Sequence, residues 1–180
     1  MYRVSVESIG GIVFLGVLFV VGILMVLAVI KFARQEKSDR RSKKAVLELG
    51  LMVAVALLTV GLFVAMRFLN VVKIEDGYLK AVFLTGFKSV EIAQVDMTDA
   101  YIIDWNADRQ YAPVRRIMGT SIGSFREGRF TLSNGDRAYL LANGSRVLVV
   151  KTRDDFYFFG PDEFDEFVSE FETKIKKINY

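Results

Sequence analysis

The sequence contains no cysteine and no histidine, and its 180 residues include only two prolines and one tryptophan. Without cysteine the chain cannot form disulfides, and without either residue it lacks the commonest zinc ligands. The absence of histidine also removes the usual base of nucleophilic catalysis. Because no other acid–base or nucleophile arrangement is visible, we expect no enzymatic activity, no metal and no cofactor.

Charged side chains are absent from two long stretches of the chain. Residues 9–30 read IGGIVFLGVLFVVGILMVLAVI, and residues 49–66 read LGLMVAVALLTVGLFVAM. A helix of about 20 apolar residues crosses the hydrocarbon core of a bilayer. The sequence therefore predicts two transmembrane helices, at about 9–31 and 46–68. A cleaved signal peptide is the alternative for the first run, but that run is too long and its basic cluster follows instead of preceding it.

The linker between the two apolar runs is strongly basic. The segment before the first run offers only Arg3 and the terminal amine. The linker holds seven basic residues: Lys31, Arg34, Lys37, Arg40, Arg41, Lys43 and Lys44. Short cytoplasmic loops carry the excess of Lys and Arg, so the loop 32–45 is predicted to be cytoplasmic. Both termini are then extracytoplasmic in a multi-pass protein of the cell membrane. A patch for anionic lipid or nucleic acid is the alternative reading of the linker.

Residues 70–180 show a different pattern, in which short apolar runs alternate with turn residues. This part carries 15 basic and 17 acidic side chains, so the overall charge of +3 comes from the membrane region. Turn signals at Asp76-Gly77, Asn134-Gly135, Asn143-Gly144 and residues 153–155 predict four β-hairpins. About seven strands at this spacing indicate a meandering antiparallel sheet or a small barrel.

The chain closes with a predicted helix that starts at Pro161, a residue suited to the first helical position. An apolar stripe follows at helical spacing, made of Phe164, Phe167, Val168, Phe171, Ile175 and Ile178. A stripe of this composition is typical of a core face, so we expect the helix to cover the open side of the sheet. The predicted fold class is α+β.

The order of strands and capping helix, with the patterns G..IG.F.EGRF.LSNG..AYL and VLVVKTRDDFYFFGPDEFDEFV, resembles the bacterial PH-like (pleckstrin-homology-like) domain family. Within that family the chain is similar to the group tethered by N-terminal transmembrane helices. The resemblance covers about residues 70–175, and Gly119, Gly123, Gly128 and Phe130 are its most specific positions. It implies a transmembrane hairpin over 1–69, followed over 70–180 by a PH-like antiparallel barrel or sandwich with a C-terminal helix.

The glycine- and arginine-rich stretch 115–130, RRIMGTSIGSFREGRF, has the glycine spacing of a phosphate-binding loop between Gly123 and Gly128. Such a loop requires Lys and then Ser or Thr after its last glycine, and a helix after that. Here Arg129 and Phe130 follow, and the alternation of Phe130 and Leu132 with polar residues predicts a strand. The glycines are therefore predicted to allow a bend, a bulge or close packing of strands.

The least regular segment is residues 105–123, which are predicted to form a connection of about 19 residues or to hide a missed element. Its candidate partner- or ligand-binding residues are Trp105, Arg109, Tyr111, Arg115 and Arg116. Aromatic and arginine side chains dominate binding hot spots because they combine large area with directional bonding. The alternative is that Trp105 and Met118 complete the core while the arginines are solvated.

Two functional hypotheses follow. The first is a membrane-anchored, non-enzymatic binding or scaffold module that recognises a protein or envelope ligand outside the membrane. The second is an accessory structural subunit whose helix hairpin packs within a larger membrane complex. The expected partners are membrane lipids through the two spans and a protein partner or a second copy of the chain, with no nucleic acid.

Overall fold

The computed structural model describes residues 1–5, 47–48, 50–61, 70–83 and 88–179, with isolated positions at 16, 20, 22–23, 27 and 30. The chain divides into two compact units, Gly10–Val64 and a second unit made of Met1–Ile9 with Ala65–Tyr180. Residues 1–5, which the predicted domain division places with the hairpin, group by their contacts with the C-terminal unit, since Tyr2 and Arg3 pair with residues 71–72.

In the unit Gly10–Val64, the described residues 47–48 and 50–61 are helical. Large apolar side chains on this helix are exposed, including Leu51 at 67% and Leu58 at 73%. Within the described ranges, no helix combines the length and the apolar character needed to cross a membrane. Most of the two predicted spans, and all of the basic loop 32–45, lie outside the described residues.

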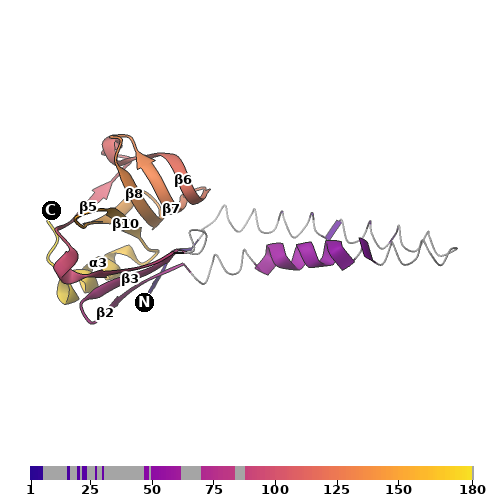
Figure 1. Ribbon diagram of the computed structural model, residues 1–180, viewed down its shortest axis with the longest axis horizontal. Helices are drawn as coiled ribbons and strands as arrows, with labels where there is room; N and C mark the ends of the chain where they lie inside the picture. Colours follow the sequence, from indigo (N-terminus) through magenta and orange to yellow (C-terminus); the bar gives the residue numbers. More distant parts are fainter. Residues whose placement is uncertain are drawn as a thin grey trace. The chain divides into compact units, whose positions relative to one another are not determined.

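The other unit contains two sheets and one helix (Figure 1). The first sheet has the order β1-β2-β3-β4 and is antiparallel throughout: β1 (Tyr2–Arg3), β2 (Val71–Glu75), β3 (Tyr78–Phe83) and β4 (Lys88–Ala93). The second has the order β5-β9-β10-β8-β7-β6: β5 (Asp99–Asp104), β6 (Pro113–Ile122), β7 (Phe125–Leu132), β8 (Arg137–Asn143), β9 (Arg146–Lys151) and β10 (Phe156–Gly160). Two short 3-10 turns, η1 (Gln94–Asp96) and η2 (Arg109–Tyr111), precede the helix α3 (Phe164–Lys174). The described residues thus hold ten strands, where about seven were expected.

Three of the four predicted hairpins are confirmed. Asp76 and Gly77 turn the chain between β2 and β3 with φ of 51° and 79°, the left-handed values that a two-residue hairpin turn requires. Gly135 turns it between β7 and β8 with φ of 91°. β9 and β10 also pair as a hairpin. In each case the turn residues were sufficient to predict both the reversal and the pairing.

The fourth hairpin is wrong, because β8 and β9 do not pair with each other. β10 lies between them, parallel to β8 and antiparallel to β9. Tyr157, Phe158 and Phe159 are all buried, as expected for a strand covered on both faces. At the end of β10, a Cβ on Gly160 would lie 3.0 Å from Ala142 on β8 and from Val147 on β9, so a larger residue would require these neighbours to move by a few tenths of an ångström. The second sheet is therefore mixed, not purely antiparallel.

The main core lies between the two sheets and α3, and it includes Phe83, Phe125 and Phe159. α3 contributes Phe167 and Phe171 to this core, and both side chains are fully buried. This confirms that the predicted apolar stripe is a core face. The helix itself begins at Phe164, three residues later than the proline-based prediction. Side chains alternate between the two faces of a strand, so the neighbouring positions of the second sheet build a second core on its other face.

The N-terminal strand β1 is held at several points. Tyr2 and Arg3 pair with β2, and the Val4 amide donates to the Asn70 carbonyl at 3.1 Å. The Ser5 amide donates to the Asp162 carboxylate at 3.1 Å, just before α3. The Tyr2 hydroxyl donates to the Glu170 carboxylate, and its ring meets Phe167 edge-on. Burial and the hydrogen bond to Glu170 raise the pKa of Tyr2 to about 12.

Candidate functional site

The segment 105–123 is mostly not a loop, because residues 113–122 form the strand β6. Its sequence hides the strand in two ways. Nearly every side chain of β6 is at least partly exposed, so no apolar alternation marks it. Two register shifts, between Pro113 and Arg115 and between Arg116 and Met118, also break its pairing with β7. The irregular part is only the short segment 105–112.

The two aromatic candidates of the predicted site complete the second core. Trp105 is 8% exposed and stacks on Phe158, with ring centroids 6.4 Å apart. Tyr111 meets Phe158 edge-on at the same separation. Burial, followed by a hydrogen bond with Tyr111, raises the pKa of the neighbouring Tyr101. Trp105 therefore presents little ring surface to a partner, whereas Tyr111 remains half-buried at the edge of the cluster.

The three arginine candidates are exposed, and they occupy different elements. Arg109 begins η2, a turn that Asp108 caps by accepting from the Gln110 amide. Arg115 lies opposite Thr131 on β7, and Arg116 lies opposite Phe130. Residues opposite each other in an antiparallel pair share a face, so Arg115 and Arg116 project to opposite faces of the sheet.

Exposed apolar side chains accompany these arginines on β6, and the sequence did not predict them. Val114 is 63% exposed, Ile117 42% and Met118 49%. Met118 was considered for the core, and that expectation is wrong. Each register shift leaves one β6 residue without a partner on β7: Val114 at the first and Ile117 at the second. Because an extra residue in a bulge re-aims side chains, the bulges account for apolar groups turned toward solvent.

Beyond the bulges, β6 and β7 approach each other closely at a pair of glycines. Gly119 and Gly128 are opposite each other, with φ of 108° and 115°. A Cβ on Gly119 would lie 2.0 Å from the Glu127 carbonyl oxygen, and one on Gly128 would lie 2.2 Å from that of Met118. This confirms the prediction of close strand packing in the glycine-rich stretch. Gly123 and Ser124 form the turn between β6 and β7, in place of a phosphate-binding loop.

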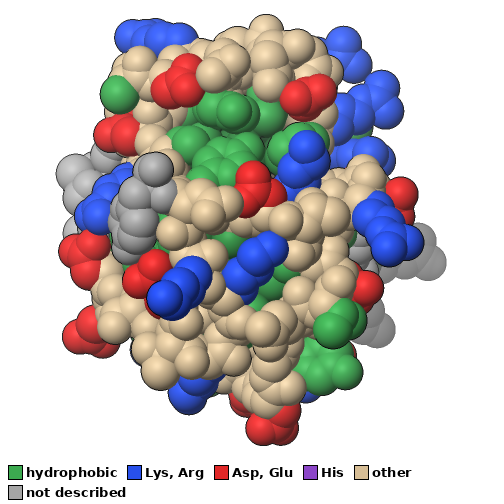
Figure 2. All heavy atoms as spheres, turned by 90° about the vertical axis from the view of Figure 1, so that its left-hand side faces the viewer, with side chains coloured by type: hydrophobic (Ala, Val, Ile, Leu, Met, Phe, Trp, Pro, Cys, Tyr) green, Lys and Arg blue, Asp and Glu red, His purple; other side chains and the backbone are tan. Residues whose placement is uncertain are grey.

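Positive charge is concentrated around these strands. Residues 109–137 contain six arginines and two acidic residues, and one of the two, Glu127, is fully buried. In Figure 2, several Lys and Arg side chains gather at the upper right, in the half of the face that belongs to the six-stranded sheet. Arg126 and Arg129 are only half-exposed, and burial lowers the pKa of Arg126. Within residues 109–137 the exposed cations are thus Arg109, Arg115, Arg116 and Arg137.

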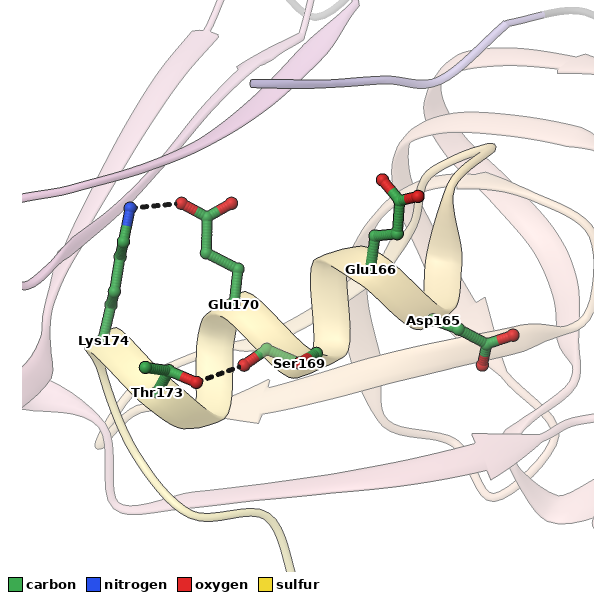
Figure 3. A pocket seen from close by; sticks show the side chains of 6 residues that line it. All are labelled: Asp165, Glu166, Ser169, Glu170, Thr173 and Lys174. Carbon is green, nitrogen blue, oxygen red and sulfur yellow. Dashed lines mark hydrogen bonds and ion pairs between the residues drawn. The ribbon is translucent and has the colours of Figure 1, made fainter.

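A shallow groove runs along the outer face of α3 (Figure 3), lined by Asp165, Glu166, Ser169, Glu170, Thr173 and Lys174. Its polar groups have structural partners. Lys174 pairs with Glu170, and the Thr173 hydroxyl donates to the Ser169 carbonyl at 2.8 Å. The hydrogen bonds from Lys174 and Tyr2 lower the pKa of Glu170. Within the described residues, no cluster of acidic side chains is arranged to hold a metal ion.

Two sheets that share a core closed by a C-terminal helix define a PH-like sandwich, and the strand β6 carries two register shifts and two exposed arginines. A profile described as "Bacterial PH domain" matches residues 72–175, more than half of the chain. The protein belongs to the bacterial PH domain family. No curated protein and no solved structure matches it. Membership of this family suggests a non-catalytic binding module.

Proposed function

We propose that this protein is a membrane-anchored, non-enzymatic binding or scaffold module that presents its PH-like domain on the extracytoplasmic face, where it recognises a protein or an envelope ligand. The observation that carries the binding role is the exposed combination of apolar and arginine side chains on β6. Arg and Met are enriched in interfaces, and large exposed apolar groups that lie together mark interaction sites.

The described part of the second apolar run supports a membrane anchor. Leu51, Leu57 and Leu58 are each at least 66% exposed on a helix that carries no charge between residues 50 and 61. The Thr59 hydroxyl donates to the Val55 carbonyl at 2.8 Å, so its polar group is satisfied within the helix. In the hydrocarbon core of a membrane there is no water, so polar groups need hydrogen-bond partners within the protein.

The pairing of β1 with β2 supports a hairpin of two spans. Tyr2 and Val72 are opposite each other in one sheet, so the chain leaves the domain near residue 5 and returns to it near residue 70 on the same side of any membrane. An even number of crossings in between satisfies this condition. The basic cluster between the apolar runs favours the cytoplasmic side for the connecting loop.

The binding role is tested by purifying the tagged full chain in mild detergent and quantifying its partners by mass spectrometry. The test variant carries Arg109→Ser, Arg115→Ser and Arg116→Ser. We expect it to fold normally, since exposed substitutions cost within about 0.5 kcal/mol each, and to lose its partner. A matched control removes three exposed cations elsewhere, at Lys151, Arg153 and Lys177.

Equal recovery of the same partners by both variants would place the binding site away from these arginines. Recovery of several proteins at fixed stoichiometry, unchanged in the test variant, would favour the accessory-subunit hypothesis instead. In that case the contacts would be made by the helix hairpin. A test variant that fails to unfold cooperatively would show that the arginines are structural.

A further inference from the structure

Among the described strands, β6 is the outer strand of its sheet, since its one neighbour there is β7. An outer strand with free backbone groups can accept a further strand, and proteins often prevent this with bulges and charges. β6 has two register shifts within residues 113–118, and Arg115 and Arg116 lie between them. A partner strand would lose its pairing register twice over these residues. The backbone of this segment is therefore poorly suited to pairing with an added strand. A partner would instead bind its side chains.

We define residues 114–118, which follow one another along this outer strand, as the β6 ridge. Its three apolar members are between 42% and 63% exposed. Within the described part of the chain, neither Arg115 nor Arg116 has an ion-pair or side-chain hydrogen-bond partner. The bulges explain how Val114 and Ile117 come to face solvent, but protection of an edge needs only the bulges and the charges. Exposed apolar side chains add nothing to that role.

We propose that the β6 ridge docks an acidic protein segment whose carboxylates are flanked by apolar side chains; this inference rests on the proposed binding function and names its partner chemistry. Guanidinium groups bind carboxylates through two parallel hydrogen bonds. Arg115 and Arg116 project to opposite faces, so carboxylates on both sides of one segment can be held. Val114 before the two arginines, and Ile117 and Met118 after them, supply apolar area on either side of those ion pairs. The flexible side chain of Met118 adapts to differently shaped partners.

Other occupants fit this surface less well. A second copy docked by its own β6 ridge would bring like charges together, because each ridge carries two arginines and no acid. Nucleic acid is held by many phosphate contacts, whereas the ridge offers two cations flanked by apolar groups. An anionic bilayer attracts proteins through net positive charge, but residues 70–180 carry 15 basic and 17 acidic side chains.

The test uses methyl NMR of the full chain in non-ionic detergent, with 13C-labelled methionine methyl groups. The sequence contains six methionines, and two of them have contrasting positions. Met118 lies on the β6 ridge, whereas Met97 is 4% exposed in the main core and serves as an internal control. The probe is a short synthetic peptide of glutamate, leucine and glycine. Its counterparts replace glutamate by lysine, or leucine by glycine.

We expect the acidic leucine peptide to shift the Met118 signal saturably and to leave Met97 unchanged. The lysine counterpart should not bind, and the leucine-free counterpart should bind at least several-fold more weakly. The variant Arg115→Glu/Arg116→Glu should weaken binding at least tenfold. Its matched control, Arg153→Glu/Lys177→Glu, reverses two exposed charges away from the ridge and should bind as the wild type does.

Several outcomes would overturn the inference. One is an equal loss of binding in both charge-reversal variants, which would indicate unspecific attraction. A second is a Met118 shift caused by phosphatidylglycerol vesicles or by single-stranded DNA but not by the peptide. A third is a concentration-dependent Met118 shift of the protein alone that the ridge variant abolishes, which would make a second copy the occupant. Partner recovery from membranes that survives the ridge variant would keep the proposed binding function while removing the acidic segment from it.

Discussion

Gly119 and Gly128 face each other at the point where β6 and β7 come closest, and the backbone alone fills the space between them. Left-handed φ values at both positions let the two strands approach without any Cβ. The pair therefore sets the path of β6 beyond its bulges. In this way two residues without side chains determine where the exposed side chains of residues 114–118 are held.

The glycine pair makes a specific prediction for stability. Gly128→Ala places a Cβ 2.2 Å from the Met118 carbonyl oxygen at an unfavourable φ, so we expect it to cost about 3 to 5 kcal/mol of unfolding free energy. Gly135→Ala is the matched control, since it shares a left-handed φ but has no neighbouring atom within 4 Å. Urea unfolding of the full chain, followed by fluorescence of the buried Trp105, measures both. If the two substitutions lowered the unfolding free energy equally, the close approach of β6 and β7 would be contradicted.

At the scale of elements, α3 closes the core with three buried residues on one face: Phe167, Val168 and Phe171. Its outer face carries polar groups paired along the helix. The same helix also fixes the N-terminal strand, because Tyr2 contacts both Phe167 and Glu170. One short helix thus covers the core and anchors the beginning of the chain.

The contribution of α3 is tested by Phe167→Ala. The side chain is fully buried, so its removal leaves a cavity and should destabilise the protein by about 3 to 5 kcal/mol. Ser169→Ala, on the exposed face two residues later, should change stability by no more than about 0.5 kcal/mol. Urea unfolding measures both variants. A loss below about 1 kcal/mol for Phe167→Ala would mean that α3 is peripheral to the fold.

The contact between Tyr2 and Glu170 predicts a pH dependence with a definite sign. The pKa of Tyr2 is raised to about 12, so its contribution is complete below pH 10 and is lost as the pH rises through about 12. The pKa of Glu170 is lowered, so its contribution is complete above the ordinary glutamate range, about 4.3, and is lost below it. The stability that wild type gains over Tyr2→Phe should be constant from about pH 5 to pH 10.

Above pH 10 that difference should shrink. The comparison with Tyr2→Phe is needed because Tyr157, whose pKa burial raises to about 12, destabilises both proteins equally at alkaline pH. Unfolding free energies of the two proteins at matched pH values provide the measurement. A difference that stays constant up to pH 12 would mean that the Tyr2 hydroxyl does not stabilise the folded state through this contact.

At the scale of the whole molecule, the proposed topology can be tested directly. A tag after Tyr180 should be removed by protease added to cells stripped of any wall. A second tag, inserted at Ser38 within the basic loop, should be cleaved only after lysis. The opposite pattern would reverse the orientation, and cleavage of both tags in intact cells would rule out a two-span hairpin.

Local sequence patterns predicted much of this architecture. The features that the sequence did not predict depend on pairing between strands that are distant in the chain. The stripe of α3 and the turn at Asp76-Gly77 were evident because their signals lie within a few residues. The insertion of β10 between β8 and β9 was not, because a turn signal specifies a reversal and not which strand becomes the neighbour. The bulges hid β6 by breaking its period, and a strand as short as β1 has no period at all.

The candidate site was predictable only in part for the same reason. That Arg109, Arg115 and Arg116 are exposed follows from the ordinary preference of arginine for solvent. That Trp105 is buried against Phe158 depends on contacts across the second sheet. The face on which each arginine lies depends on the register of β6 with β7. The exposure of Val114 and Ile117 depends on two bulges, and a short stretch of sequence does not predict these.

The pairing of β1 also has a consequence for the timing of biosynthesis. The Tyr2 hydroxyl donates to Glu170, 168 positions later in the chain. β1 can pair with β2 once Val71 and Val72 are synthesised, but its contact with α3 can form only after Glu170 has been added and both segments have reached the same compartment. Contacts so distant in sequence form slowly, because a long loop must close first. The docking of β1 on α3 is thus expected among the late steps of folding.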